Sequence, residues 1–270
     1  MKKRRLIPVI LIKNGWVVQS RNFLEFQKIG SPITSVKRCS EWGSDELIFL
    51  DISRESAYDL NRDDLNIKNP NSFYDIINEI SKICFMPIAV GGGVKNVQQI
   101  ERMLINGADK VVINSEAQVN PSFIEEAAKK FGSQCIVNSI DVKFNLEKKE
   151  YEIYIEKGKI RSKYSLVEWL NIAQKIGVGE IFLNSIDRDG TGSGYDIDLI
   201  NFVEKKIRIP LISCGGAGNF EHFLFVASKT NTDGIAAANF FQYLDQSIFI
   251  TKKKLLENKH NFRKAELMEI

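Results

Sequence analysis

The amino-acid sequence predicts a single (β/α)8 barrel, and two observations lead to this fold class. Eight short, continuously apolar runs alternate with segments whose apolar residues recur near a 3.6-residue period. Strands that are apolar throughout are typical of a parallel sheet whose outer face is covered by helices. The two halves of the chain also resemble each other, as expected for a duplicated half-barrel. An open, doubly wound sheet is the competing arrangement.

The predicted elements form strand–helix pairs along residues 1–270, which we take as one domain. The predicted strands are 6–12, 46–51, 87–90, 110–113, 135–140, 180–184, 210–213 and 234–237. The predicted helices are 32–43, 71–83, 96–106, 120–131, 165–177, 196–206, 219–229 and 240–258, the last within a C-terminal helical tail over about 240–270. Charged residues alternate with β-formers over about 145–165, which predicts an exposed hairpin inserted after the fifth strand.

The internal repeat shows which positions of the two halves correspond. PIAVGGGVKN at 87–96 matches PLISCGGAGN at 210–219, and GADKVVINS in the first half matches NTDGIAAAN in the second. A nearly constant offset between such pairs makes Leu11, near the end of the first strand, the counterpart of Asp141 on the fifth. At corresponding positions, the fifth strand therefore ends in a carboxylate and the first strand in an apolar side chain.

The composition limits the function classes. With 37 basic and 34 acidic residues the net charge is +3, so neither a nucleic-acid nor a membrane partner is indicated. The apolar run after the basic start is short and ends at Lys13, which fits neither a signal peptide nor a membrane span, and we expect a cytoplasmic protein. The four cysteines lack metal-ligand spacing, so no metal and no cofactor is predicted.

Residues at the carboxyl ends of the strands are the candidates for ligand binding, because barrels of this kind carry their active sites there. Glycines at these ends let backbone N–H groups approach an anion, helped by the helix start that follows. Glycine pairs in the same register of both halves predict two phosphate cradles and a ligand with a phosphate at each end; tight turns alone are the alternative. The predicted phosphate-binding residues are Gly92, Gly93, Asn114, Ser115, Asp189, Gly190, Thr191, Gly215, Gly216, Ala238 and Asn239.

Four carboxylates are expected at the same face: Asp51, Asp141, Asp187 and Asp189. Asp141 ends a wholly apolar strand, where an acid is costly unless it is used or paired. General acid–base catalysis is its expected role. A structural acid paired with Lys143 is the alternative.

Charged residues also stand at the starts of four strands, at the opposite end of the predicted barrel. They are Arg5, Glu46, Lys110 and Glu180, on the first, second, fourth and sixth strands. Their alternating signs predict a closed ring of ion pairs at the amino-terminal mouth. The residue types alone are also compatible with a polar plug that closes the barrel.

Five sequence blocks are specific enough to indicate a family. They are DELIFLDI (45–52), VGGGV (90–94), NGADKVVINSEA (106–117), EIFLNSIDRDGTGSGYD (180–196) and SCGGAGNFEHF (213–223). Over nearly its whole length the chain resembles the cyclase subunit of imidazole glycerol phosphate synthase, the HisF type of barrel from histidine biosynthesis.

The resemblance implies a reaction and a partner. In that family a HisH-like glutaminase docks at the amino-terminal face, and its ammonia passes through the barrel. The ammonia then reacts with a bis-phosphorylated ribulosyl-aminoimidazole nucleotide in a lyase reaction. The resemblance makes the charged ring an ammonia gate and the glycines at 92–93 and 215–216 phosphate ligands, and it makes Asp141 one of two catalytic aspartates.

The sequence departs from the family pattern at three positions. The catalytic aspartate of the first strand falls on Leu11, so one of the two acid–base roles is empty. The family's usual lysine in VVKG is Gln19 in VVQS, which removes a cation that would meet substrate phosphate. Asn239 stands where the family usually has serine, a mild change because an amide can still donate.

These departures fall on substrate chemistry and leave the charged ring intact. They resemble a branch of the family, associated with surface-polysaccharide loci, that works beside a glutaminase and an N-acetyl-sugar amidotransferase to make an acetamidino sugar. We therefore expect a subunit that delivers ammonia for this modification. Two alternatives stay open: a working cyclase in which water, Asp51 or Asp187 replaces the missing acid, and a non-catalytic barrel that binds a phosphorylated ligand.

Overall fold

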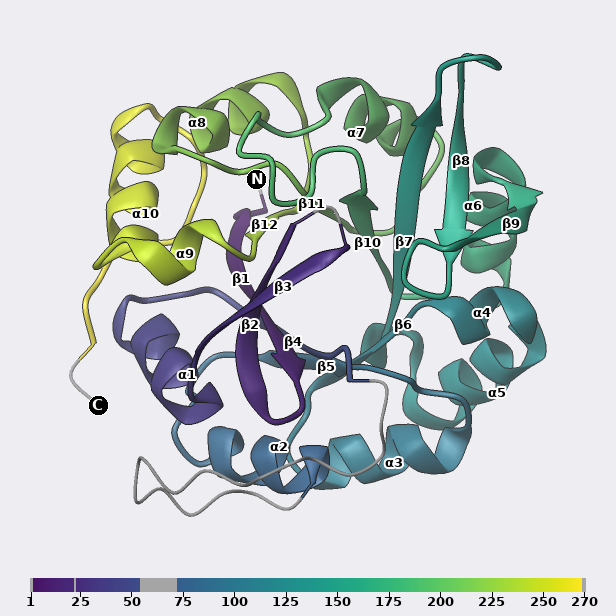
Figure 1. The fold of residues 1–270 in the computed structure, drawn as a ribbon, viewed down its shortest axis with the longest axis horizontal. Helices are drawn as coiled ribbons and strands as arrows, with labels where there is room; N and C mark the ends of the chain where they lie inside the picture. The colour runs from purple at the N-terminus through teal and green to yellow at the C-terminus, as the bar shows by residue number, and fades with distance from the viewer. Residues whose placement is uncertain (1, 22, 54–71, 269–270) are drawn as a thin grey trace.

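The predicted (β/α)8 barrel is confirmed by the computed structural model, which describes residues 2–21, 23–53 and 72–268 (Figure 1). Within this part of the chain the barrel strands are β1 (Arg5–Lys13), β4 (Leu47–Asp51), β5 (Ile88–Gly91), β6 (Lys110–Ile113), β7 (Ile136–Asn145), β10 (Glu180–Ser185), β11 (Leu211–Cys214) and β12 (Gly234–Ala237). Neighbouring strands pair in parallel in this order, and parallel pairing of β7 with β10 and of β12 with β1 closes the sheet.

Helices surround the barrel and bury their apolar faces against it (Figure 1). They are α1 (Pro32–Glu41), α2 (Phe73–Ser81), α3 (Val97–Ile105), α4 (Ser115–Val119), α5 (Pro121–Phe131), the 3-10 turn η1 (Ser133–Cys135), α6 (Leu166–Lys175), α7 (Ile197–Glu204), α8 (Phe220–Lys229), α9 (Phe240–Tyr243) and α10 (Ser247–Glu257). Several begin at a side-chain cap: Ser72 accepts a hydrogen bond from the Asp75 N–H at the start of α2, and Ser165 and Glu168 form a capping box at α6.

The barrel interior is a second, separate core. Because side chains alternate along a strand, every second residue of each barrel strand points inward. The buried inward-facing residues are Ile7, Val9, Ile48, Ala89, Val112, Val137, Phe182, Ile212 and Ala236. Leu11, Leu50, Cys214 and Ala238 pack on this cluster from the carboxyl end of the strands, where they are only partly buried. An apolar core therefore fills the space between the two polar ends of the barrel.

Equivalent contacts in the two halves agree with the internal repeat. Asp109, just before β6, accepts a hydrogen bond from the Ile88 N–H at 2.8 Å. Asp233, just before β12, accepts one from the Leu211 N–H at 3.0 Å. Each aspartate thus caps the start of the preceding barrel strand, at matching positions of the two sequence blocks.

Two antiparallel additions extend the barrel at its carboxyl end. The hairpin β2 (Trp16–Arg21) and β3 (Glu25–Gly30) follows β1 directly and lies across the barrel mouth in Figure 1. The strands β8 (Glu150–Ile155) and β9 (Ile160–Ser165) follow β7, which continues beyond the barrel to pair with β8. Residues 145–165, expected to form an exposed hairpin, contain the antiparallel pair β8–β9, and β8 also pairs with the end of β7.

The C-terminal segment is helical only as far as Glu257 and not up to the end of the chain. Residues 258–268 run back along the barrel, where Phe262 bridges to Arg4 and the Met268 N–H donates to the Glu41 carbonyl. Among the described residues no helix is long and apolar enough to cross a membrane.

Candidate active site at the strand ends

A closed ring of ion pairs occupies the amino-terminal end of the barrel. The Arg5 guanidinium on β1 donates to the carboxylates of both Glu46 and Glu180. The Lys110 ammonium on β6 lies 2.8 Å from an oxygen of each of the same two carboxylates. The structure therefore brings together all four predicted ring residues, with charges that alternate around the mouth.

Burial makes this ring an electrostatically coupled unit. The carboxylates are the buried members, with 2% of the Glu46 side chain and 6% of the Glu180 side chain exposed. Burial alone would raise the pKa of Glu180, but hydrogen bonds and charge from Arg5 and Lys110 hold it below its usual value. Lys110 is the most exposed member, with 21% of its side chain accessible, against 16% for Arg5.

Asp141 is buried at the other end, inside the carboxyl end of β7. Its carboxylate accepts hydrogen bonds from Asn114 Nδ2 at 2.7 Å and from Asn184 Nδ2 at 3.5 Å. Burial raises the pKa of Asp141 to about 6, the two amide donors oppose the rise, and the charge of Asp189 adds to it. A carboxyl group with this pKa can both release and accept a proton near neutral pH.

Leu11 offers no such chemistry on β1. Its neighbour in the sheet is Leu50 of β4, and both pack on the apolar core inside the barrel. Asp51 follows Leu50 and so points to the other face of the strand, where its carboxylate accepts the Ser53 N–H at 2.9 Å. Asp187 accepts the Phe144 N–H at 2.7 Å. Each of these two acids is thus held by a backbone N–H group.

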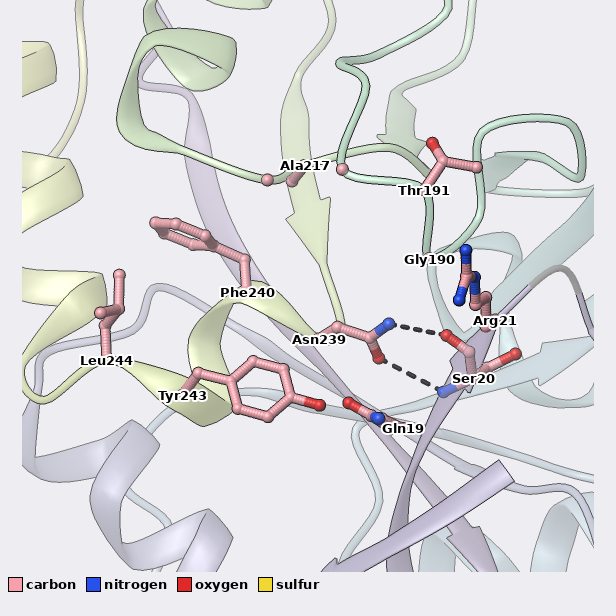
Figure 2. Close-up of a pocket in the computed structure, with 12 residues that line it drawn as sticks. Gln19, Ser20, Arg21, Gly190, Thr191, Ala217, Asn239, Phe240, Tyr243 and Leu244 are labelled. Carbon is pink, nitrogen blue, oxygen red and sulfur yellow. Dashed lines mark hydrogen bonds between the residues drawn. The ribbon is translucent and has the colours of Figure 1, made fainter. Parts of the chain in front are cut away.

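A cavity of about 500 Å³ opens at the carboxyl ends of β10, β11 and β12 (Figure 2). Its walls include three predicted phosphate-binding residues, Gly190, Thr191 and Asn239. The predicted glycines 215–216 are not part of its lining. At Gly216, with φ of +100°, a Cβ atom would lie 2.1 Å from the Gly194 carbonyl oxygen, so this glycine is required for the packing of two loops.

The turn between β8 and β9 contacts the cradle predicted after β5 and β6. Ser115 Oγ accepts a hydrogen bond from the Glu156 N–H at 2.9 Å. Lys157 Nζ donates to the carbonyls of Ile52 at 3.0 Å and Ser53 at 3.2 Å. The two predicted cradles thus differ: residues of the second border an open cavity, and Ser115 of the first bonds to the turn between β8 and β9.

The sequence prediction named Gln19 but missed Ser20 and Arg21, the other two residues of β2 that border the cavity. Ser20 Oγ donates to Asp189 at 2.9 Å, and burial raises the pKa of Asp189 to about 6 against this bond and one from the Phe23 N–H. The signal was present, because Asn-Gly followed by alternating residues is a strong β-hairpin signature. Asn14 and Gly15 both have positive φ, as that turn requires.

The described residues contain no group of three or more His, Cys, Asp or Glu side chains that could hold a metal ion. The carboxyl face carries two buried acids, Asp141 and Asp189, with amide side chains and loop backbone N–H groups beside them.

Fold and site together define a (β/α)8 barrel with a ring of ion pairs at one end. The other end has a buried carboxylate and loops of the kind that bind anions. The chain belongs to the histidine biosynthesis protein family, which matches residues 5–246. The imidazole glycerol phosphate synthase subunit HisF of Streptococcus mutans is 38% identical over 258 residues, covering 96% of this chain and 98% of that protein. The HisF subunit of Hydrogenobaculum sp. is 39% identical over 263 residues, covering 97% and 100%. The HisF subunit of Lactococcus lactis is 36% identical over 259 residues, covering 96% of each.

Proposed function

We propose that this chain is the barrel subunit of a glutamine amidotransferase complex and delivers ammonia for the acetamidino modification of a surface-polysaccharide sugar. The observation that carries this proposal is the contrast between the two barrel ends. The charged ring is complete, with Arg5 and Lys110 each bridging the two buried carboxylates. The opposite end has Leu11 where a second acid is needed for the cyclase reaction.

The chemistry of ammonia supports the ring and the apolar interior as a conduit. An apolar interior disfavours ammonium, whose charge is costly to bury, far more than neutral ammonia. The ring lies directly before the apolar residues Ile7, Val112 and Phe182 of the same strands. If one cation of the ring moves outward, the mouth opens to a small neutral molecule. Lys110 is the member we expect to move, because Glu46 and Glu180 are more deeply buried.

The glutaminase partner fits this arrangement on chemical grounds. Ammonia set free in bulk water at neutral pH is mostly protonated, so a donor enzyme has to release it at the mouth of the conduit. We therefore place a HisH-like glutaminase on the amino-terminal face and an N-acetyl-sugar amidotransferase as the acceptor enzyme beyond the barrel.

A working cyclase is the second candidate, and Asp141 is the observation that favours it. This acid is retained and buried, and its pKa of about 6 suits general acid–base catalysis. The relatives in Streptococcus mutans and Hydrogenobaculum sp. carry the name imidazole glycerol phosphate synthase.

The cyclase assay separates the two candidates. With the bis-phosphorylated nucleotide and excess ammonium, we expect no turnover by the wild-type chain and measurable turnover by Leu11→Asp, because that change supplies the second proton-transfer group. Leu146→Asp, at an 82%-exposed surface position, is the matched control and remains inactive. Turnover by the wild-type chain at the rate of a histidine-pathway enzyme would overturn the acetamidino proposal.

The conduit is tested by the ring variant Glu46→Gln in a reaction reconstituted with glutaminase and amidotransferase. We expect glutamine-dependent product formation to fall while ammonium-dependent formation is kept, because the defect lies in delivery and not in transfer. Lys129→Gln, which removes an exposed helix ion pair with Glu125, is the control and changes neither rate. If no glutaminase binds the chain or is activated by it, the delivery proposal is wrong and a non-catalytic binding barrel is favoured.

A further inference from the structure

One charged side chain borders the cavity at the ends of β10, β11 and β12. The twelve lining residues, all within the described part of the chain, include a single ionisable group of full charge at neutral pH, the Arg21 guanidinium. Figure 2 shows Arg21 reaching from the end of β2 toward Gly190 and Thr191. Gly190, Gly192 and Ala217 also line this cavity, and their backbone N–H groups have no acceptor among the described residues. The cavity thus combines one cation with several hydrogen-bond donors.

The side-chain amide of Asn239 holds β2 at this cavity. Its Nδ2 donates to the Ser20 carbonyl at 2.6 Å, and its Oδ1 accepts the Ser20 N–H at 3.3 Å (Figure 2). Both polar atoms of the amide are therefore used to clamp the backbone of one residue. Asn239 thus acts in this structure as a clamp for the hairpin, and the clamp uses one of the two N–H donors of its amide.

Two further contacts fix the same end of β2. Ser20 Oγ donates to the buried Asp189 at 2.9 Å. At Gly190, with φ of +67°, a Cβ atom would lie 2.5 Å from the Ser20 carbonyl oxygen and 2.7 Å from Arg21 Cα, so the absence of a side chain lets the strand approach. The Asn239 amide, the Ser20 hydroxyl and the close packing on Gly190 together fix the position of Arg21 at the end of β2.

The alternation of β2 places Gln19 and Arg21 on the same face, and both line the cavity. The Gln19 amide is engaged with the facing strand, because its Nε2 donates to Gln27 Oε1 at 2.7 Å. The Arg21 guanidinium, by contrast, has no hydrogen-bond or ion-pair partner among the residues described. The cation that Gln19 lacks is thus present two residues further along the same face.

We propose that Arg21 binds a terminal phosphate group of the barrel's ligand in this cavity and supplies the charge that a lysine at position 19 would otherwise provide. A guanidinium can hold two phosphate oxygens at once, while the loop N–H groups take the remaining one. This inference rests on the proposed function only in taking the ligand to be phosphorylated.

Calorimetric titration of the full chain with inorganic phosphate tests the assignment without any glutaminase. We expect Arg21→Gln to weaken phosphate binding by about tenfold or more, since a charge-assisted bidentate contact is lost. Arg21→Lys should retain part of the affinity. The double variant Arg21→Gln with Gln19→Lys should recover binding, because the cation returns to the same face. Lys28→Gln removes an exposed cation of β3 that does not line the cavity and should leave binding unchanged.

The proposal is overturned if Arg21→Gln binds phosphate as the wild type does, or if the wild-type chain binds none at millimolar concentrations. An equal loss in Lys28→Gln would also overturn it, because general surface charge would then explain the effect. None of these results bears on ammonia delivery, which is measured separately with the glutaminase.

Discussion

At the scale of single residues, the two strand ends that correspond in the repeat have opposite electrostatics. Asp141 is an acid kept in a buried site by two amides, which donate to it at 2.7 and 3.5 Å. Leu11 lies on the apolar core that the inward-facing side chains of the barrel form. The two corresponding strand ends thus differ, because β7 presents a carboxyl group that can transfer a proton and β1 presents none.

The raised pKa of Asp141 predicts a pH dependence of stability. The pKa is about 6 in the folded chain and near 3.8 in the unfolded chain, so folding favours the protonated form. This contribution is fully present below pH 4 and is lost as the pH rises through 6. Asp141→Asn has no charge to bury, so its free energy of unfolding should exceed that of the wild type by about 3 kcal/mol above pH 7 and by little below pH 4.

Urea unfolding midpoints at several pH values between 4 and 8 measure this difference. Asp245→Asn, at an exposed carboxyl group, is the control and should follow the wild-type curve. A difference between Asp141→Asn and wild type that stays constant over this pH range would show that burial does not raise this pKa.

At the scale of elements, the hairpin β2–β3 depends on a glycine of a different loop. Gly190 and Gly93 both have positive φ, +67° and +61°, but only Gly190 has atoms within 4 Å of a Cβ position. Gly190→Ala therefore combines backbone strain with a collision against β2, whereas Gly93→Ala has the strain alone. We expect Gly190→Ala to lower the free energy of unfolding by about 1–2 kcal/mol more than Gly93→Ala, and to expose the hairpin to limited proteolysis.

Thermal unfolding and protease cleavage sites of the two variants measure this effect side by side. If both variants unfold alike and keep an intact hairpin, the close packing of Ser20 on Gly190 does not hold β2 in place.

The accuracy of the sequence prediction also varies with the element. Barrel strands were found because each is a short, continuously apolar run, and the ring was found because strand starts share one end of a barrel. Strand β2 was missed although Asn14 and Gly15 announce the turn that joins it to β1, since the search followed strand–helix alternation. The clamp of Asn239 on Ser20 joins residues far apart in the chain and requires three-dimensional information.

At the scale of the whole molecule, the two ends of the barrel have different tasks in the proposed function. The carboxyl end receives a ligand between the hairpin and the loops of β10, β11 and β12, and the amino-terminal end receives ammonia through the ring. A partner that feeds the ring has to cover the amino-terminal face. That face is formed by the segments that lead from each helix into the next barrel strand.

Two exposed apolar side chains mark this face beside the ring. Phe85, in the segment between α2 and β5, is 75% exposed, and Ile105, at the end of α3 before β6, is 79% exposed. The strands β5 and β6 are neighbours, and Lys110 of the ring begins β6. Large apolar side chains in such positions are the usual anchors of protein interfaces, where truncation costs 1 kcal/mol or more.

We expect Phe85→Asp and Ile105→Asp each to weaken glutaminase binding by about tenfold or more, because a charge then replaces an apolar anchor that the interface would bury. Leu146→Asp is the matched control: its side chain is 82% exposed, but it lies in the turn between β7 and β8 at the opposite end of the barrel. Binding is measured by calorimetry with the full chain, and phosphate affinity is followed in parallel. Loss of glutaminase binding with phosphate affinity unchanged places the partner on the amino-terminal face. Equal weakening by Leu146→Asp, or none by either anchor variant, would mean that the partner binds elsewhere and that the ring is a structural plug.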